Sequence, residues 1–505
     1  MASSTKTFDC IVIGSGQSGT PLATSLAQSG RKTALIERSH IGGCCVNEGC
    51  TPTKTMIASG RVAYLASRAA DYGVYQKTQT PAYAVLRGPK DGEHAPIPGA
   101  VKKMPIIDMV KVRQRKRDIV QTFRGGSEAR LKNVKNLEIV IGEASFTSAH
   151  GLSVKAADGT TTDYEAETFF INVGERPRKP WLQGLPEVEA SELKDRILDS
   201  TSIQELDHVP EKLIVLGGSY IGMEFGQLFR RLGSKVTVVQ RGKQLVPRED
   251  KEFGQAMLDI CKDDGIEVIF NASDAPEDTI AVSRDKRSIV LTCNIDGTAT
   301  KVEGSHILFA AGRTPNTDAL NLDKAGIEVD KRFHIKVSPT LQTSIPHIYA
   351  LGDCHGGPAF THISYDDFRI IKANFIDQTA KQLSTADRRI PYVMYTDPQL
   401  AHVGLHEHEA RREHGGDKVK TASMPMSYVA RALETDETRG LMKAVVHAET
   451  EQILGFTCLG LEGGEIMSIV QVAMMGGLKY TALQQAVFAH PTLAESLNNL
   501  WGFLK

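Results

Sequence analysis

The chain has 505 residues, with 59 Lys and Arg against 60 Asp and Glu, so its formal net charge at pH 7 is −1. This balance lacks the basic excess typical of nucleic-acid-binding proteins, and no apolar run approaches the ~18–20 residues that span a membrane. At roughly 100–200 residues per domain, the length indicates about three domains.

The N-terminal segment has no apolar signal-peptide core, so we expect a cytoplasmic protein. Eight cysteines are too few for a disulfide scaffold in a chain of this length. Five are scattered, and we expect them to be small buried side chains: Cys10, Cys261, Cys293, Cys354 and Cys458. The other three, Cys44, Cys45 and Cys50, lie close together and need a separate explanation.

The first predicted elements are an apolar strand over residues 8–13, a helix over 20–29 and a second strand over 33–36. The glycines Gly14, Gly16 and Gly19 lie between the first strand and the helix, and Glu37 ends the second strand. This is the βαβ dinucleotide fingerprint: the first glycine allows the tight turn, the second admits the pyrophosphate and the third permits close helix packing. The acid is placed to accept hydrogen bonds from a ribose.

The cysteine-bearing segment, residues 42–54, follows this unit directly. Cys45 and Cys50 can meet across one helical turn and form a disulfide if their geometry allows it. A zinc site would need a second cysteine or histidine pair at matching spacing, which the sequence lacks, so we expect no metal. A redox-active pair beside a flavin is the better interpretation.

The dinucleotide pattern recurs with strands over 212–216 and 235–239, a helix ending at residue 232, and glycines at Gly217 and Gly222. Two such folds imply two nucleotides and electron transfer between them. Ser219 replaces the middle glycine of the pattern.

The residue that matches the ribose-binding acid is Gln240, with Arg241 beside it and Arg248 further on. An acid would repel a 2′-phosphate, whereas a neutral amide beside arginines accommodates one. We therefore favour NADPH over NADH. The alternative is that both arginines only solvate a surface loop.

The basic run over residues 113–117 is expected to be a solvated helix face. After residue 385 the character of the chain changes, with a strand-rich segment from residue 391 and helices from residue 464. This indicates a third domain for self-association.

The segment from Gly42 to Lys54 matches the pattern GGxCxNxGCxP[ST]K, and it resembles the class I pyridine nucleotide–disulfide oxidoreductases. That family includes glutathione reductase, dihydrolipoyl dehydrogenase, trypanothione reductase and mercuric reductase. Further matching segments lie at residues 171–174, 311–317, 350–353 and 391–404, so the resemblance covers almost the whole chain.

The resemblance implies an α/β fold with two Rossmann-like dinucleotide-binding domains, for FAD and NAD(P), and a C-terminal α+β dimerisation domain. The implied boundaries are 1–180 and 318–385 for FAD binding, 181–317 for NAD(P) binding and 386–505 for the interface. The implied enzyme is a homodimer with shared active sites and a small disulfide or dithiol substrate.

Specific residues carry the implied cofactor contacts. Asp353 matches the aspartate that binds the flavin ribityl chain, Lys54 and Glu224 match an ion pair near flavin N5, and Tyr220 matches the gate of the nicotinamide pocket. Gly43, Gly174 and Gly312 belong to the matching cofactor-binding segments.

The implied reaction passes a hydride from NADPH to FAD, which opens the Cys45–Cys50 disulfide. Cys50 then lies as a thiolate against the flavin, and Cys45 attacks the substrate. His490 and Glu495, in a segment resembling HPTxxE, act on the partner subunit's site, with the histidine as acid and base. The cycle could also run backwards and oxidise a dithiol.

Two departures leave alternatives open. Cys44 stands where the family usually has threonine, either without a role or as a third thiol, and Glu48 adds a carboxylate that would raise a nearby cysteine pKa. Several segments resemble mercuric reductases, but those lack the acid–base pair of His490 and Glu495. A metal-ion reductase, a dithiol oxidase of sulfur-containing small molecules and a non-catalytic flavoprotein are therefore the alternatives to a disulfide reductase.

Overall fold

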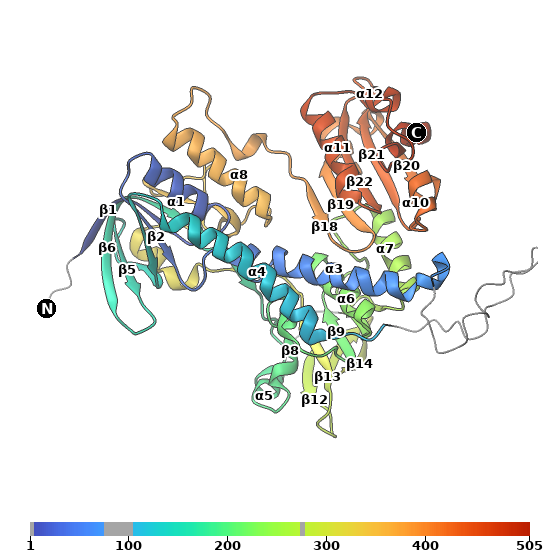
Figure 1. The fold of residues 1–505 in the computed structure, drawn as a ribbon, viewed down its shortest axis with the longest axis horizontal. Coiled ribbons are helices and arrows are strands. Elements are labelled where there is room, and N and C mark those ends of the chain that lie inside the picture. The colour runs from blue at the N-terminus through green and yellow to red at the C-terminus, as the bar shows by residue number, and fades with distance from the viewer. Residues whose placement is uncertain (1–4, 75–104, 273–277) are drawn as a thin grey trace, which may run out of the picture.

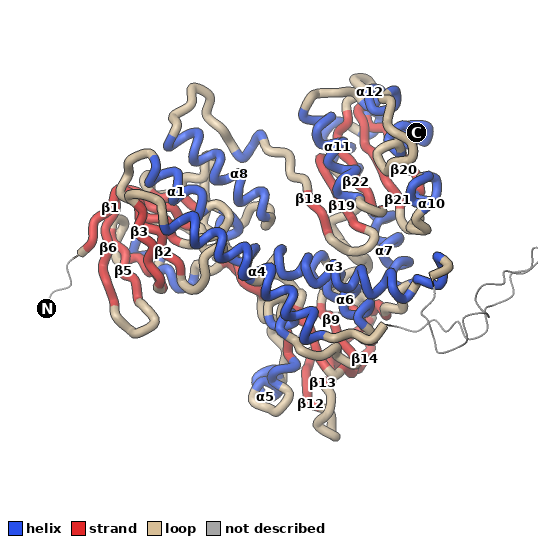
Figure 2. The backbone as a smooth tube through the Cα atoms, viewed as in Figure 1, coloured by secondary structure: helices blue, strands red, loops and turns tan. Residues whose placement is uncertain are grey.

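The computed structural model describes residues 5–74, 105–272 and 278–505, so residues 1–4 of the N-terminal segment lie outside it. Strands gather in three groups, and long helices run across the middle between them (Figure 2). This mixed α/β architecture confirms the expected fold class. Within the described ranges, we find no helix with both the length and the apolar character needed to cross a bilayer.

The first group is a seven-stranded sheet in the order β3-β2-β1-β6-β5-β4, with β17 paired to β6. Its strands are β1 (Lys6–Ile13), β2 (Thr33–Glu37), β3 (Leu137–Ile141), β4 (Glu143–Phe146), β5 (Gly151–Lys155), β6 (Thr161–Ile171) and β17 (Ile348–Ala350). Helices α1 (Gly19–Gln28) and α8 (Thr361–Ile371) lie beside it (Figure 1). Because β17 joins this sheet far later in the sequence, two chain segments build it; the boundaries 1–180 and 318–385 stay a prediction.

The second group is a five-stranded sheet in the order β11-β10-β9-β15-β8, in which all neighbouring strands are parallel. Its strands are β8 (Ile197–Leu198), β9 (Lys212–Leu216), β10 (Lys235–Val239), β11 (Glu267–Ile269) and β15 (His306–Phe309). Three antiparallel strands lie beside it: β12 (Thr279–Val282), β13 (Ile289–Ile295) and β14 (Thr298–Gly304). The short strands β7 (Glu175–Pro177) and β16 (Arg313–Pro315) pair with each other where the chain enters and leaves this region.

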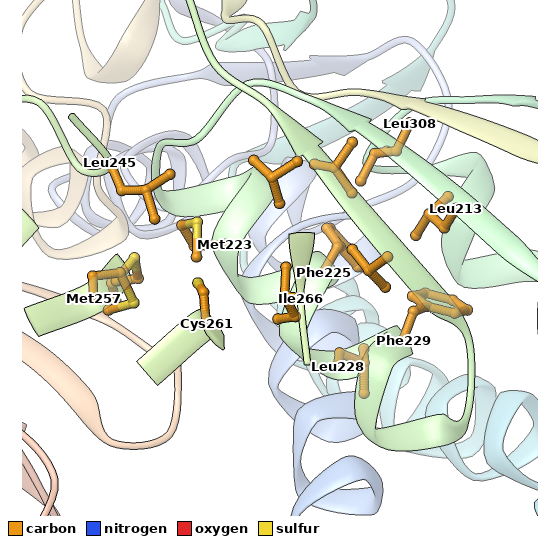
Figure 3. Close-up of a cluster of buried hydrophobic side chains, with 14 of the residues drawn as sticks. Leu213, Met223, Phe225, Leu228, Phe229, Leu245, Met257, Cys261, Ile266 and Leu308 are labelled. Atoms are coloured by element: carbon orange, nitrogen blue, oxygen red, sulfur yellow. The ribbon is translucent and has the colours of Figure 1, made fainter. Parts of the chain in front are cut away.

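Helix α6 (Tyr220–Leu232) anchors the second group through its apolar face. Phe225 and Phe229 are buried beside Leu213 of β9 and Leu308 of β15 (Figure 3). Helix α7 (Lys251–Asp263) adds Met257 and Cys261 to the same cluster, whereas α5 (Leu185–Glu189) packs against β12 in a separate apolar cluster. Since truncating a buried aromatic costs about 3–5 kcal/mol, this packing holds the first residue of α6, Tyr220, in a defined place.

The third group is an antiparallel sheet in the order β18-β19-β22-β21-β20. Its strands are β18 (Tyr392–Met394), β19 (Gln399–Gly404), β20 (Val419–Pro425), β21 (Leu441–His447) and β22 (Ile453–Gly460). Its helices are α9 (Glu407–His414), α10 (Ala430–Glu434), α11 (Gly463–Met475), α12 (Tyr480–Gln485) and α13 (Ser496–Asn499). Val472 and Met475 of α11 are exposed apolar side chains in the single chain.

Helix α3 (Cys50–Ser67) crosses the centre of the molecule beside α4 (Met109–Lys132) and packs against α6 (Figure 1). The short helix α2 (Gly43–Asn47) precedes it. The prediction that residues 113–117 form a solvated face is wrong for Lys116, which is buried, because its ammonium pairs with the carboxylate of Glu205.

Candidate functional site

A glycine loop joins β1 to α1 at the edge of the first sheet. Gly14 has a φ of +99°, and a Cβ there would lie 2.2 Å from the carbonyl oxygen of Asn172, so only glycine fits. A Cβ on Gly43 would lie 2.6 Å from Cα of Gly16, so two backbone segments meet without side chains between them. Glu37 fixes this loop by accepting hydrogen bonds from the N–H (3.0 Å) and the hydroxyl (2.6 Å) of Ser15.

A cleft with about 1260 Å³ of space, open solvent included, begins at this loop and reaches the cysteine segment. Its lining includes the predicted flavin-contacting residues Gly14, Gly16, Glu37, Gly43, Gly174 and Asp353, together with Cys44 and Cys45. Burial raises the pKa of Asp353 to about 6, with a further rise from the carboxylate of Glu175. A bare backbone loop for a pyrophosphate and two carboxyl groups for hydroxyls fit FAD.

Asn172 joins the two halves of this cleft, a role that the sequence did not reveal. Its side-chain oxygen accepts the N–H of Gly19 at 2.9 Å, and its side-chain amide donates to the carbonyl of Leu351 at 2.9 Å. It therefore connects the first helix to the loop that carries Asp353. The sequence identified the segment 171–174 that contains Asn172, but it did not indicate which distant residues the side chain contacts.

The cysteine pair lies where α2 meets α3. Cys45 is in α2, Cys50 begins α3, and all eight cysteines, each within the described ranges, are unbonded thiols. The hydroxyl of Thr361, at the start of α8, donates to Sγ of Cys45 at 3.0 Å and lies 3.3 Å from Sγ of Cys50. Thr361 brings a residue of the distant α8 to both sulfurs, and nothing in the local motif indicated it.

The two sulfurs differ in acidity. A hydrogen bond from Cys45 and the nearby ammonium of Lys54 lower the pKa of Cys50 to about 5. The hydrogen bond to Cys50 and burial raise the pKa of Cys45 above its ordinary value. The position of Cys50 at a helix N-terminus favours the same charge state, because the helix dipole stabilises a thiolate there. These pKa directions favour a thiolate at Cys50 and a neutral thiol at Cys45 in the dithiol form.

Lys54 is fixed by a carboxylate on another helix. Its ammonium lies 2.8 Å from Oε2 of Glu224, and the same carboxylate accepts the N–H of Tyr395 at 2.8 Å. The structure thus brings together the predicted ion pair, with its cation beside Cys50.

Cys44 points to a different neighbour. Its sulfur lies 3.5 Å from Nη2 of Arg313, and burial raises its pKa while that guanidinium opposes the rise. Glu48 is exposed, and its carboxylate adds to the raised pKa of Cys44. This arrangement favours a packing role for Cys44 over membership of the redox pair.

The second glycine loop repeats the first in detail. Oε1 of Gln240 accepts the N–H of Gly218 at 2.9 Å, as Glu37 does in the first loop, and its side-chain amide donates to the carbonyl of Gln244 at 3.0 Å. Gly217 and Gly222 meet so closely that a Cβ on the latter would lie 1.9 Å from the carbonyl oxygen of the former.

The predicted nucleotide-contacting side chains surround this loop. Arg241 and Arg248 are exposed beside it, and Tyr220 donates from its hydroxyl to Oε1 of Glu249 at 2.9 Å. Gly312 precedes β16 in a left-handed conformation, with a φ of +115°.

His490 and Glu495 form a pair in the C-terminal region. Nδ1 of the histidine lies 3.0 Å and 2.9 Å from the two carboxylate oxygens, and its ring is exposed in the single chain. Neither residue lines the cleft of its own chain. The structure thus places the predicted acid–base pair together but apart from the cysteines.

One acidic cluster between α7 and α9 already has a cation. Asp250, Glu252 and Glu407 bring carboxylate oxygens together, and the ammonium of Lys443 pairs with all three. That ammonium fills the place of a metal ion.

Two dinucleotide-binding folds that flank a thiol pair define the class of nicotinamide-linked disulfide oxidoreductases. Residues 8–367 match the family model for pyridine nucleotide-disulphide oxidoreductases, and residues 390–500 match the model for the dimerisation domain of these enzymes. The chain belongs to this family, as the sequence motifs predicted. It is a flavoprotein oxidoreductase that uses FAD and a pyridine nucleotide, and its C-terminal region is a dimerisation domain.

The chain is similar over almost its whole length to several named proteins. It is 31% identical over 501 residues to the probable pyridine nucleotide-disulfide oxidoreductase RclA of Escherichia coli, covering 99% of both chains. It is 31% identical over 490 residues to a mercuric reductase of Lysinibacillus sphaericus, covering 97% of this chain and 81% of the relative. The solved structure of RclA, described as an HOCl-induced flavoprotein disulfide reductase, matches with a TM-score of 0.82 and 30% identity over 98% of this chain and all of that one.

Proposed function

We propose that this protein is an NADPH-dependent disulfide reductase that passes electrons through FAD and the Cys45–Cys50 pair to a small disulfide. The observation that carries this proposal is a pair of sulfurs that both lie within 3.3 Å of the Thr361 hydroxyl, with Cys45 and Thr361 lining the cleft and with unequal acidity of the two thiols. A low-pKa thiolate can donate charge to an oxidised flavin, and the neutral thiol becomes the nucleophile toward a substrate once a base removes its proton.

FAD in this cleft would accept a hydride from the nicotinamide and deliver the electron pair to the cysteine disulfide. Lys54, held by Glu224, then stabilises the Cys50 thiolate. Cys45 attacks one substrate sulfur and forms a mixed disulfide, and the other sulfur leaves as a thiol. Cys50 then attacks Cys45, which releases the second thiol and restores the intramolecular disulfide.

Proton transfer falls to the histidine pair. The ring of His490 of the partner subunit, oriented by Glu495, takes the proton of Cys45 and returns it to the leaving sulfur. The exposure of this pair in the single chain and its absence from the cleft lining support a site shared between subunits. In sum, NADPH, a proton and a disulfide give NADP⁺ and two thiols.

The choice of NADPH over NADH rests on Gln240, Arg241 and Arg248. The amide of Gln240 occupies the place of the ribose-binding acid and brings no negative charge. The exposed arginines can pair with a 2′-phosphate. We also propose the domain boundaries given by the sequence and a cytoplasmic location.

The test is a steady-state panel on the flavin-loaded dimer, with NADPH and NADH against glutathione disulfide, lipoamide, cystine and Hg(II). We expect turnover of at least one disulfide with NADPH, and loss of that turnover in Cys45→Ser and Cys50→Ser. His490→Gln should lower disulfide turnover by roughly 10²–10⁴-fold, the usual contribution of a general acid–base.

Cys44→Thr is the matched control and should stay active, because Cys44 contacts Arg313 rather than the pair. Disulfide turnover that persists in Cys45→Ser would refute the proposal. Turnover of Hg(II) alone, unaffected in His490→Gln, would instead favour the metal-ion reductase.

A further inference from the structure

A buried carboxylate lies between two phenols near the second glycine loop. Tyr220 donates to Oε1 of Glu249 at 2.9 Å, and Tyr392 of β18 donates to the same oxygen at 2.8 Å. Glu249 is 5% exposed, and its Oε2 has no hydrogen-bond partner within the described part of the chain. One oxygen thus carries two donors from different regions of the molecule.

Two histidines extend this network. Nε2 of His406 lies 3.1 Å from the hydroxyl of Tyr392 and donates to it, because the phenol's own proton is directed to Glu249. The ring of His402 stacks on His406 with centroids 3.8 Å apart and planes inclined by 13°. The nitrogens of His402 hydrogen-bond to the hydroxyl of Thr457 and the carbonyl of Gly404.

Glu249, His402 and His406 lie close enough to invite a metal-site interpretation, which their geometry opposes. The lone pairs of two parallel, stacked imidazoles lie in separate planes and do not converge on one ion. Both nitrogens of His402 are also engaged in hydrogen bonds. The cluster is therefore a hydrogen-bond network that ends at Tyr220.

This network adjoins the redox site on two sides. Tyr220 lies one helical turn before Glu224, which holds Lys54 beside Cys50. The ring of Tyr392 stacks on Phe360 at 5.7 Å, and Phe360 lines the flavin-shaped cleft. Glu249 therefore connects the nucleotide-binding region, the dimerisation domain and the cleft.

We propose that Glu249 is a positioning residue that holds Tyr220 at the closed nicotinamide entrance and releases it when the nucleotide binds. This inference rests on the proposed function and on the resemblance by which Tyr220 matches the gate of the nicotinamide pocket. The two donors explain how release is possible: when Tyr220 swings away, Tyr392 still donates to Oε1, so opening does not leave the buried carboxylate without a donor.

Burial and the nearby charges make the hydrogen bond from Tyr220 to Glu249 sensitive to pH. Burial raises the pKa of Glu249 to about 7, and Asp250 adds to the rise, while the bonds from Tyr392 and Tyr220 and the guanidinium of Arg248 oppose it. The facing phenols Tyr220 and Tyr392 have pKa values raised by burial and by Glu249, and burial lowers the pKa of His406 and of His402. Among these groups Glu249 titrates nearest to neutrality, and protonation weakens it as an acceptor.

Calorimetric binding of NADP⁺ to the holoenzyme tests the inference without a disulfide substrate. In Glu249→Gln the acceptor is neutral, so Tyr220 is held less firmly and the Kd for NADP⁺ should fall roughly 5-fold at pH 8, the ratio between charged and neutral hydrogen bonds. In Tyr392→Phe the carboxylate depends on Tyr220 alone, so the Kd should rise. Opposite shifts distinguish gating from a purely structural role, which would weaken binding in both variants.

Glu267→Gln is the matched control, since this carboxylate accepts a hydroxyl of Thr237 at 2.8 Å in the same region, and its Kd should not change. A carboxylic-acid infrared band that titrates near pH 7 should be present in the wild type and absent in Glu249→Gln. The ratio of the Kd of Glu249→Gln to that of the wild type should also approach one as the pH falls below 7. Shifts in the same direction for Glu249→Gln and Tyr392→Phe, or no shift in either, would overturn the inference; loss of disulfide turnover alone would affect only the proposed function.

Discussion

Cys50 and Cys45 have the same side chain but different neighbours, and those neighbours favour a thiolate at Cys50 and a neutral thiol at Cys45. Cys50 has a thiol donor, a helix N-terminus and the ammonium of Lys54 beside it, whereas Cys45 has burial and an adjacent negative charge. This difference in acidity distinguishes the two sulfurs in the reduced pair.

Removing the ammonium of Lys54 should reduce the difference in acidity between Cys50 and Cys45. In Lys54→Met the pKa of Cys50 should rise, so the thiolate of the reduced enzyme forms only at higher pH than in the wild type. An absorbance titration of the thiolate in the two-electron-reduced enzyme measures this shift. Lys6→Met, which removes an exposed ion pair with Glu138, should leave the titration unchanged; identical curves for Lys54→Met and wild type would contradict the assignment.

The buried carboxyl of Glu249 predicts a pH dependence of stability. Its folded pKa of about 7 lies above the ordinary 4.5, so its contribution is fully present below pH 4.5 and is lost as the pH rises through 7. The Glu249→Gln variant lacks this pH-dependent loss. Its free energy of unfolding, relative to that of the wild type, should therefore increase by up to about 3 kcal/mol between pH 4.5 and pH 8. Urea denaturation at several pH values checks this, and parallel pH profiles would show that the carboxyl is not proton-linked.

At the scale of single elements, local sequence was a good guide. The strand predicted over 235–239 matches β10, and the helix expected to end at residue 232 matches α6. The strand is a short run of buried residues and the helix ends at Gly233, and such signals lie within a few residues of one another.

The connection between elements depends on Asn172, which the sequence placed only within a motif. Asn172→Ala should leave the buried N–H of Gly19 and carbonyl of Leu351 without their partner, which costs about 3 kcal/mol and lowers flavin retention. Thermal unfolding and the flavin-to-protein absorbance ratio measure both effects. Asn374→Ala removes two similar bonds to the backbone of Leu383 near the surface and should cost under about 1 kcal/mol; an equal loss in both variants would refute a special role for Asn172.

For the whole molecule, one acid joins three regions. Asp397, between β18 and β19, pairs with Arg61 of α3 and Arg231 of α6, and its backbone carbonyl accepts a bond from Gln227 at 2.8 Å. Burial opposes its ionisation, yet the two guanidinium groups hold the pKa of Asp397 below its usual range.

Breaking this junction should loosen the dimerisation domain from the rest of the chain. Asp397→Asn leaves the guanidinium of Arg231 without its carboxylate partner, whereas Arg61 keeps Glu437, and the loss should be about 3 kcal/mol. Calorimetric unfolding is the measurement, with Asp436→Asn, an exposed partner of Arg68, as a control that should change little. A small effect in Asp397→Asn would show that apolar packing alone joins the regions.

The sequence by itself determined the family, the two nucleotide folds and the predicted positions of Cys45, Cys50 and His490, because each depends on residue types at fixed short spacings. Only the tertiary structure decided that Thr361 contacts both sulfurs, that Arg313 faces Cys44 and that Tyr392 shares the carboxylate of Glu249. These partners are between 143 and 316 residues apart in the chain. Short spacings are set by the geometry of one helix or turn, whereas distant contacts depend on how whole sheets and helices pack, and no local pattern encodes that packing.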